Sequence, residues 1–331
     1  MPNLPKPRLR RSARGRVDGH AEPASSEPQI EEVAFDGLRW INVERPGPME
    51  QAWLEEHFEF HPLAYEDVRS RNQRPKLDEY PDYLFIVLHF PVFDKAVGRL
   101  NTGELDVFVG PDFLITLPHA PLQPVEYLFE RCRTSDEVAG SLFSKGSGYL
   151  LYKIVDDCVD YCFPMLRKIG NKLDRVEDDI FQGRSDEVVR DISNVKQEII
   201  NFRKTVRPQR PVLRGLERTK QRYLAEDMEL YWDDIVDASE RIWDMLENYK
   251  EVVEALEDTN ESVLSHRQND VLRALTAATV VFMPLTLVAS IWGMNVRVPG
   301  EGELVGFFVV LAGMVALLCT VIAVFKRQGW L

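Results

Sequence analysis

The longest uninterrupted apolar stretches of this chain lie near its C-terminal end. No residue between Arg273 and Arg297 carries a formal charge, and this run of 23 residues is mostly apolar. A second uncharged run extends from Leu304 to Phe325. A bilayer core of about 30 Å is crossed by about 20 helical residues at 1.5 Å each. The pattern therefore predicts two membrane-spanning helices, the first ending at residue 292 and the second covering 304–325, joined by a loop over 293–303.

The first predicted span carries a stripe of polar residues on one face. Residues at alternating steps of three and four share a helix face. Here they are Asn269, Leu272, Thr276, Thr279, Met283, Thr286 and Ser290. Small and hydroxylated residues let helices pack closely in lipid, but polar residues within a membrane also line water-filled paths. The pattern alone leaves both interpretations open.

The helix that enters the membrane is predicted to be very long. Neither glycine nor proline occurs between Gly215 and Pro284, so one helix can cover 229–292 and include the first span. Apolar residues recur in it at steps of three and four: Ile235, Ile242, Leu246, Tyr249, Val253, Leu256 and Val263. Such a helix needs packing partners to be stable. Because two spans cannot enclose a path, we expect several chains to assemble around an axis.

The same helix is strongly acidic. From Glu226 to Glu261 there are 14 Asp or Glu residues, against Arg241 and Lys250. Like charges one turn apart destabilise an isolated helix. Two explanations are open: divalent cations bind to these oxygen-rich clusters, or basic residues elsewhere in the protein offset them.

The part before residue 147 contains both helix-like and strand-like patterns of apolar residues. Residues 1–30 are rich in arginine, proline and serine, which predicts a disordered basic tail. Gly110-Pro111-Asp112 stands between two apolar runs and predicts a hairpin. The predicted strands cover 38–43, 83–88, 105–109 and 113–117, and the predicted helices lie near 49–58 and 62–70. We therefore assign 31–146 to an α/β domain.

Helical patterns dominate from Tyr149 onward. We expect one helix from there to Phe181 and a second over 186–206, and we expect Pro208 and Pro211 to break the chain. Residues 147–228 are thus a helical hairpin, 229–292 the long stalk helix, and 326–331 a basic tail. The predicted fold class is α+β, with an α/β domain followed by long helices and two C-terminal transmembrane helices.

The composition argues against some functions. With 53 acidic and 40 basic residues and a net charge of −13, the chain lacks the basic excess that phosphate contacts of a nucleic-acid binder need. Its four cysteines form no paired framework, so buried thiols in a reducing compartment are expected. The first 30 residues contain no apolar signal segment, and the part before the spans is expected in the cytoplasm.

No enzymatic motif stands out. There is no glycine-rich phosphate loop, no HExxH, no nucleophile elbow and no paired cysteine motif. The six histidines are scattered without ligand spacing. A membrane-tethered enzyme is therefore not expected, and a structural tether would explain the stalk but not the polar stripe.

A short motif follows the first predicted span, where Gly-Met-Asn after an aromatic residue stands as Trp292-Gly293-Met294-Asn295. With this signature the sequence resembles the CorA family of magnesium transporters, and the likeness runs from about residue 33 to the end. Further matching segments are Phe282-Met283-Pro284-Leu285-Thr286, the basic tail over 325–331, His61-Pro62-Leu63-Ala64-Tyr65-Glu66-Asp67, and Gln73-Arg74-Pro75-Lys76.

The resemblance implies a funnel-shaped homopentamer in the inner (plasma) membrane, with both termini in the cytoplasm and no enzymatic activity. Lys326 and Arg327 after the second span agree with that orientation. The resemblance also implies an ion-entry ring at Gly293, Met294 and Asn295. The implied pore and gate residues are Asn269, Leu272, Leu275, Thr279, Met283 and Thr286.

The resemblance further implies Mg²⁺ as both the transported and the regulatory ion. Asp67 and Asp234, with Glu66 and Asp237 close by, match a regulatory metal site between subunits. The loop Val296-Arg297-Val298-Pro299-Gly300-Glu301-Gly302-Glu303 departs from the usual Met-Pro-Glu-Leu of magnesium members. The zinc-transporting ZntB branch also lacks that loop, but usually has Val where this chain has Met294. Magnesium is therefore favoured, with cobalt or nickel as analogues and zinc as the alternative.

Overall fold

The computed structural model describes residues 28–70, 73–94, 99–182, 185–219, 228–294 and 304–327. The predicted basic tail thus lies almost wholly outside the described residues. The chain divides into two compact units. The first comprises Met1–His89, Gly103–Val155 and Gly215–Tyr231, and the second comprises Phe90–Thr102, Asp156–Arg214 and Trp232–Leu331.

A mixed sheet forms the centre of the first unit. In the described part of the chain its strands are β1 (Glu31–Phe35), β2 (Leu38–Asn42), β3 (Lys76–Glu79), β4 (Leu84–Asp94), β5 (Arg99–Val109) and β6 (Phe113–Pro118). Their order is β1-β2-β6-β5-β4-β3. β2 and β6 are parallel, whereas the pairs β1–β2, β5–β6 and β3–β4 are antiparallel. The predicted β5–β6 hairpin is confirmed.

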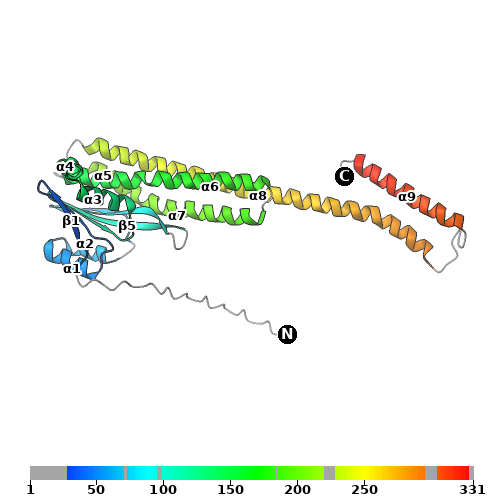
Figure 1. The fold of residues 1–331 in the computed structure, drawn as a ribbon, viewed down its shortest axis with the longest axis horizontal. Helices are drawn as coiled ribbons and strands as arrows, with labels where there is room; N and C mark the ends of the chain where they lie inside the picture. The colour runs from blue at the N-terminus through cyan, green and yellow to red at the C-terminus, as the bar shows by residue number, and fades with distance from the viewer. Residues whose placement is uncertain are drawn as a thin grey trace, which may run out of the picture. The chain divides into compact units, whose positions relative to one another are not determined.

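Helices cover both faces of this sheet (Figure 1). Helices α1 (Pro48–His57) and α2 (Pro62–Arg69) pack on one face, where the apolar cluster includes Leu54, Phe60 and Phe108. On the other face lie α3 (Gln123–Thr134) and α4 (Asp136–Phe143), and the Phe129 ring meets Trp40 edge-on at 5.0 Å. Neighbouring residues of a strand point to opposite faces of the sheet, so each strand supplies one group of residues to the α1 and α2 face and another to the α3 and α4 face.

A hydrogen-bonded chain of three side chains lies inside the α3 face. The indole of Trp40 donates to Thr116 Oγ1 at 3.0 Å, and that hydroxyl donates to Asn42 Oδ1 at 2.8 Å. All three residues are buried. Replacing Thr116 by Val leaves a buried donor and a buried acceptor unpaired, each at a cost of about 1 to 3 kcal/mol. We expect the apparent melting temperature of the purified full-length protein to fall by roughly 5 to 10 °C.

The matched control for that change is Thr134→Val. Thr134 is exposed at the end of α3, and its hydroxyl donates to carbonyls of its own helix, Glu130 at 2.8 Å and Arg131 at 3.4 Å. We expect a shift within about 2 °C, because surface substitutions usually cost less than about 0.5 kcal/mol. Equal shifts for the two variants would contradict the role assigned to Thr116.

Long helices build the second unit. They are α6 (Cys162–Gln182), α7 (Ser185–Arg218), α8 (Glu229–Trp292) and α9 (Leu304–Arg327), together with the end of α5 (Ser147–Asp160). Helices α7 and α8 are antiparallel, as their ion pairs Lys196–Glu257, Arg203–Glu247 and Arg210–Glu240 record. Figure 1 shows α6 and α7 beside α8. The predicted fold class is confirmed, including the long helices.

The expected break at Pro208 and Pro211 is wrong, because α7 continues to Arg218. Each proline frees the carbonyl four residues earlier, at Lys204 and Arg207. Those residues and both prolines are exposed, so the freed carbonyls belong to the solvent side of the helix. Phe202, Val206, Leu213 and Leu216 on the opposite face stay buried, and their packing keeps the helix intact.

The single helix expected over 149–181 is also wrong in one respect, because α5 ends at Asp160 and α6 begins at Cys162. A turn at Tyr161 separates them. Both helices have buried apolar residues up to this turn, among them Val159 and Cys162.

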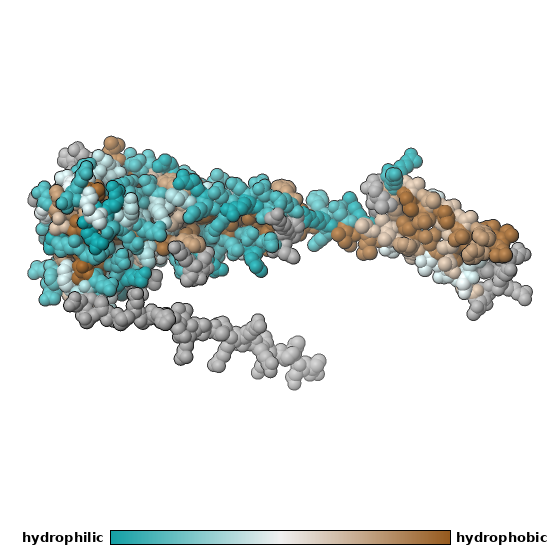
Figure 2. Space-filling model, in the orientation of Figure 1, coloured by the Kyte–Doolittle hydropathy of each residue, from teal (hydrophilic) through white to brown (hydrophobic). Residues whose placement is uncertain are grey.

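Two of the described helices, α8 and α9, are long and apolar enough to cross a membrane. Figure 2 shows hydrophobic residues over α9 and over the part of α8 nearest its C-terminal end. Exposed large apolar side chains there include Val271, Phe282, Leu287, Phe307 and Phe308. In water such surface would be unfavourable, so lipid is the environment that suits it.

Candidate functional site

The predicted pore residues all lie on the surface of α8. Asn269, Thr279 and Thr286 are exposed, and so are the larger apolar members of the set. Leu272 is 58% exposed, Leu275 62% and Met283 71%. No part of the described chain covers this stripe.

The covered face of the same helix segment lies on the opposite side. Its least exposed residues are Ala277, Val281, Pro284, Leu285 and Val288. At 3.6 residues per turn, the centre of this set lies about 180° around the helix from the centre of the predicted pore residues. Helix α9 runs beside this part of α8 in Figure 1, and its own less exposed residues also share one face: Gly306, Val310, Met314, Leu317, Leu318, Val321 and Phe325. The polar stripe therefore points away from α9.

The threonine hydroxyls of the stripe donate their hydrogen bonds to backbone carbonyls of the same helix. Thr279 Oγ1 donates to the Leu275 carbonyl at 2.9 Å, and Thr286 Oγ1 donates to the Phe282 carbonyl at 2.8 Å. What each hydroxyl presents outward is an oxygen that accepts hydrogen bonds. The water shell of a cation consists of donors, so these oxygens suit a hydrated cation.

Helix α8 ends where the signature begins. Gly293 N donates to the Ala289 carbonyl at 2.9 Å, and Met294 N donates to the Ile291 carbonyl at 3.4 Å. A Cβ on Gly293 would stand 3.1 Å from the Ala289 carbonyl oxygen, so a larger residue would crowd this helix end. Asn295, the third predicted member of the ion-entry ring, lies outside the described residues.

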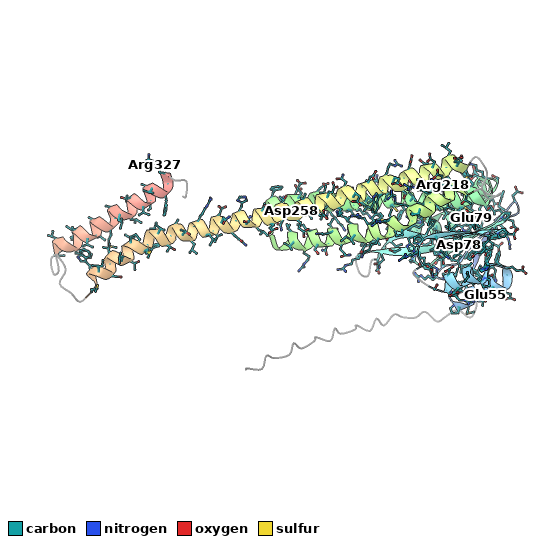
Figure 3. The ribbon with its side chains drawn as sticks, turned by 180° about the vertical axis from the view of Figure 1, so that it is seen from behind. Glu55, Asp78, Glu79, Arg218, Asp258 and Arg327 are labelled. Carbon is teal, nitrogen blue, oxygen red and sulfur yellow. The ribbon has the colours of Figure 1, made fainter. Side chains whose placement is uncertain are left out.

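The predicted regulatory residues lie on different units. On the first unit, Asp67 and Glu66 line a surface hollow of ≈ 640 Å³ together with residues of β3. Lys76 Nζ contacts Asp67 Oδ2 at 2.5 Å and Asp78 Oδ2 at 2.7 Å; Figure 3 shows Asp78 on β3. Burial by itself lowers the pKa of Lys76, but the hydrogen bonds and charges of the two aspartates raise it overall. The ammonium group of Lys76 therefore already neutralises the charge of Asp67.

Asp234 and Asp237 lie one turn apart on α8, in the second unit, and both are exposed. Some of the acidic residues on α8 have basic partners on α7. Glu240 pairs with Arg210 and Arg214, and Lys196 pairs with Glu257. Basic partners on α7 therefore offset part of the acidic charge of α8, as one of the two explanations left open expects, and Asp234 and Asp237 remain candidates for a divalent cation.

The interpretation that the histidines are scattered is wrong for one of them. His119 Nε2 lies 2.8 Å from Asp106 Oδ2 and 3.7 Å from Glu104 Oε1, inside the first unit. The three residues could hold a metal ion. Their spacing along the chain hides this, because the hairpin alone brings residue 119 beside residue 104.

Comparison with known proteins gives a consistent result. A family model described as "CorA-like Mg2+ transporter protein" matches residues 35–327. The cobalt/magnesium transport protein CorA of Thermotoga maritima is 30% identical over 296 residues, covering 88% of this chain and 83% of that protein. The protein of the same name from Methanocaldococcus jannaschii is 25% identical over 312 residues, covering 92% of this chain and 96% of that protein.

The fold is similar to a solved structure as well. The structure of the CorA magnesium transporter from Methanocaldococcus jannaschii has a TM-score of 0.79 and 23% sequence identity, covering 92% of this chain and 95% of that chain. At this identity the likeness concerns the fold. It includes the α/β sheet domain and the long helices.

Proposed function

Since the chain belongs to the CorA-like Mg²⁺ transporter family, we propose that it conducts Mg²⁺ through a pore formed by several copies and that cytoplasmic Mg²⁺ closes this pore. At the coarser level, the protein is a divalent cation transporter of this family and not an enzyme. The proposal concerns the ion, the assembly and the gating. We place the protein in the plasma membrane with both termini in the cytoplasm.

The observation that carries the proposal is the uncovered polar stripe of α8. Thr279 and Thr286 face away from α9 and would meet lipid in a single chain, and Asn269 lies on the same face just before the span. The outward hydroxyl oxygens find no hydrogen-bond donor in hydrocarbon, which is unfavourable for a polar group. Surrounding the stripe with copies of itself leaves these groups in a water-filled lumen instead. We favour five copies, following the resemblance.

Ion selection follows from the chemistry at the end of α8. Mg²⁺ loses its water reluctantly, so a ring of neutral amide and carbonyl oxygens at Gly293 and Asn295 selects it through its hydration shell. A neutral ring also binds weakly enough for the ion to leave, as conduction requires. Leu272, Leu275 and Met283 then form apolar constrictions that close the path when water leaves them.

Gating rests on charge repulsion between neighbouring copies. Mg²⁺ bound at Asp67 and Asp234, with Glu66 and Asp237 nearby, screens carboxylates that face each other and supports a symmetric closed state. When cytoplasmic Mg²⁺ falls, the unscreened carboxylates repel each other and the closed state loses support. Lys76 contributes a positive charge at Asp67, so Mg²⁺ competes with the lysine ammonium for this carboxylate.

A zinc transporter of the ZntB type is the second candidate, because the loop after Asn295 lacks the Met-Pro-Glu-Leu segment. Met294 favours magnesium over it. The stripe chemistry favours magnesium as well, since its donors and acceptors are oxygen and amide groups and Zn²⁺ prefers nitrogen and sulfur ligands.

The test is ion uptake by the purified protein in liposomes, read by an enclosed Mg²⁺ or Zn²⁺ indicator. We expect Mg²⁺ uptake at least roughly tenfold above protein-free liposomes, with Co²⁺ and Ni²⁺ as slower permeants. Zn²⁺ uptake without Mg²⁺ uptake would favour the ZntB alternative. No uptake of either ion by a correctly assembled protein would refute transport and leave a tether.

A further inference from the structure

A group of charged side chains continues the apolar face of the first unit's sheet. Residues of β5 alternate between faces, so Glu104 and Asp106 point to the same side as Phe108. Phe108 belongs to the apolar cluster under α1 and α2. Glu104 and Asp106 are themselves buried, so two carboxylates stand where the pattern would otherwise place apolar groups.

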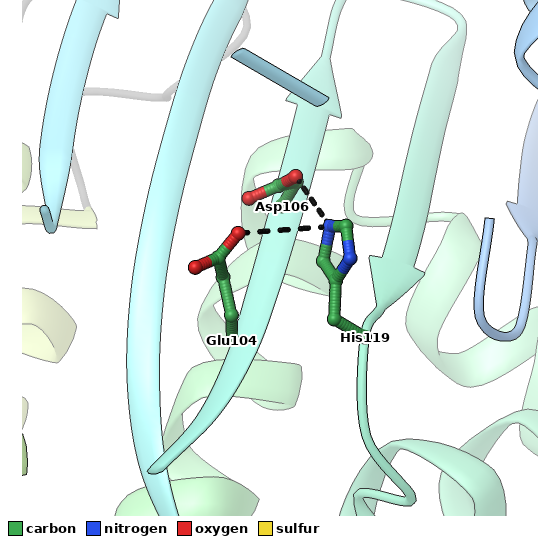
Figure 4. A group of neighbouring side chains, drawn as sticks. All are labelled: Glu104, Asp106 and His119. Atoms are coloured by element: carbon green, nitrogen blue, oxygen red, sulfur yellow. Dashed lines mark hydrogen bonds and ion pairs between the residues drawn. The ribbon is translucent and has the colours of Figure 1, made fainter. Parts of the chain in front are cut away.

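The strand register brings an imidazole to these carboxylates. β5 and β6 pair Leu105 with Pro118, and the next residue, His119, donates its backbone N–H to the Glu104 carbonyl at 2.9 Å. His119 is thus the cross-strand neighbour of Glu104 and the diagonal neighbour of Asp106. Figure 4 shows the ring directed at both carboxylates.

The carboxylates are incompletely satisfied by protein groups. Among the described residues, no hydrogen bond reaches Asp106 Oδ1 or Glu104 Oε1, although both atoms are buried. Asp106 is fully buried, and the Glu104 side chain is 8% exposed. Two buried carboxylates with unpaired oxygens, both within 4 Å of one imidazole nitrogen, therefore favour additional positive charge beside them.

We propose that Glu104, Asp106 and His119 bind one transition-metal dication of the Zn²⁺ or Co²⁺ class, at a site separate from the pore. Two ligands of a tetrahedral Zn²⁺ at 2.0–2.2 Å are about 3.4 Å apart. The His119 nitrogen lies 2.8 Å from one carboxylate oxygen and 3.7 Å from the other, so small side-chain shifts produce that geometry.

The donor set decides which ions bind. Mg²⁺ needs a near-octahedral shell of oxygens and keeps several waters, and a buried site with an imidazole ligand supplies neither. Nitrogen with carboxylate oxygen suits Zn²⁺ and Co²⁺. His89 Nε2 lies 3.6 Å from Glu104 Oε2, so a second imidazole stands beside this carboxylate.

The experiment measures Co²⁺ binding to the purified full-length protein in a large excess of Mg²⁺, which fills sites made of oxygen ligands alone. We expect about one retained Co²⁺ per chain with the strong visible absorption of a low-symmetry nitrogen–oxygen site, displaced by Zn²⁺. His119→Gln and Asp106→Asn should weaken Zn²⁺ binding at least tenfold, roughly, and abolish that absorption.

His57→Gln is the matched control, because His57 is exposed on α1 and its loss should change nothing. Glu104→Gln provides a third variant that keeps the size of the side chain and removes its charge, in case one of the other variants folds poorly. Zn²⁺ should also raise the apparent melting temperature of the unsubstituted protein and not of the variants. Absence of retained Co²⁺, or an unchanged spectrum in His119→Gln, would overturn the proposal and leave a cluster that holds a proton only. Because no transport is measured, this outcome is separate from the fate of the proposed function.

Discussion

Replacing Asn295 by Ala is expected to reduce the initial rate of Mg²⁺ uptake into liposomes by roughly tenfold or more. The change removes one amide from every copy in the proposed entry ring. The hydrated ion then loses the acceptors that hold its water shell at the mouth, and Mg²⁺ does not readily exchange that water for other ligands. The measurement is the initial uptake rate at several external Mg²⁺ concentrations, which separates weaker binding from slower passage.

The matched control for Asn295 is Asn171→Ala. Asn171 is an exposed residue of α6, so the same chemical change is made away from the proposed pore. We expect its uptake rate to equal that of the unsubstituted protein. Both variants should run as the same oligomer in detergent. If Asn295→Ala assembles normally and transports at the full rate, the entry ring is assigned to the wrong residue.

Replacing Asp67 and Asp234 together by Ala is expected to abolish the inhibition of uptake by Mg²⁺ inside the liposome. In the proposed mechanism, bound Mg²⁺ supports the closed state because it screens these carboxylates across an interface between copies. Without them the closed state gains nothing from Mg²⁺, since a ligand shifts an equilibrium only by its differential affinity for the two states. Uptake should then be independent of internal Mg²⁺ over the range that silences the unsubstituted protein.

A double variant with the same loss of charge serves as control for the regulatory pair. Asp82 and Asp258 are exposed, one in each unit, and Figure 3 labels Asp258 on α8. Asp82→Ala with Asp258→Ala should keep the inhibition by internal Mg²⁺. Inhibition that persists in the Asp67 and Asp234 double variant would show that regulation resides elsewhere on the protein.

The parts of the fold that sequence predicts well are those whose environment repeats along the chain. The uncharged runs over 274–296 and 304–325 correspond to the C-terminal part of α8 and to α9. β2, β4, β5 and β6 lie inside the sheet, where burial selects apolar residues. β1 and β3 are the edge strands, and their sequences EEVAF and KLDE carry the charges typical of edges. They were not predicted for that reason.

Features that depend on contacts between separate segments of the chain were not predicted from the sequence. Pro208 and Pro211 predict a break locally, but the buried opposite face of α7 outweighs two missing backbone hydrogen bonds on its exposed side. The residues Glu104 and His119 are far apart in the chain, and only the hairpin makes them neighbours. If Val109 pairs with Leu114, the same hairpin register places Glu104 opposite His119. The turn at Gly110-Pro111-Asp112 therefore contained the information needed to predict that Glu104 and His119 are neighbours.

The polar stripe of α8 could be predicted in part. Its spacing on one face of α8 can be derived from the sequence, because helical geometry fixes which residues share a face. That the stripe lies opposite the face beside α9 could not be derived, since it depends on which residues of α9 are covered. The roles of Asn269, Leu272, Leu275 and Met283 remain predictions that flux measurements on variants decide.

Helix α8 is continuous from Glu229 to Trp292, and Pro284 is its first helix-breaking residue. In the proposed gating, a rotation of this uninterrupted helix about its own axis near Asp234 would carry the proposed gate residues Leu272 and Leu275 with it. A side-chain tip about 5 Å from the axis then moves roughly 2 Å for a turn of about 20°. A displacement of that size exceeds the radius of a water molecule, so it would be enough to wet or dry the proposed constriction.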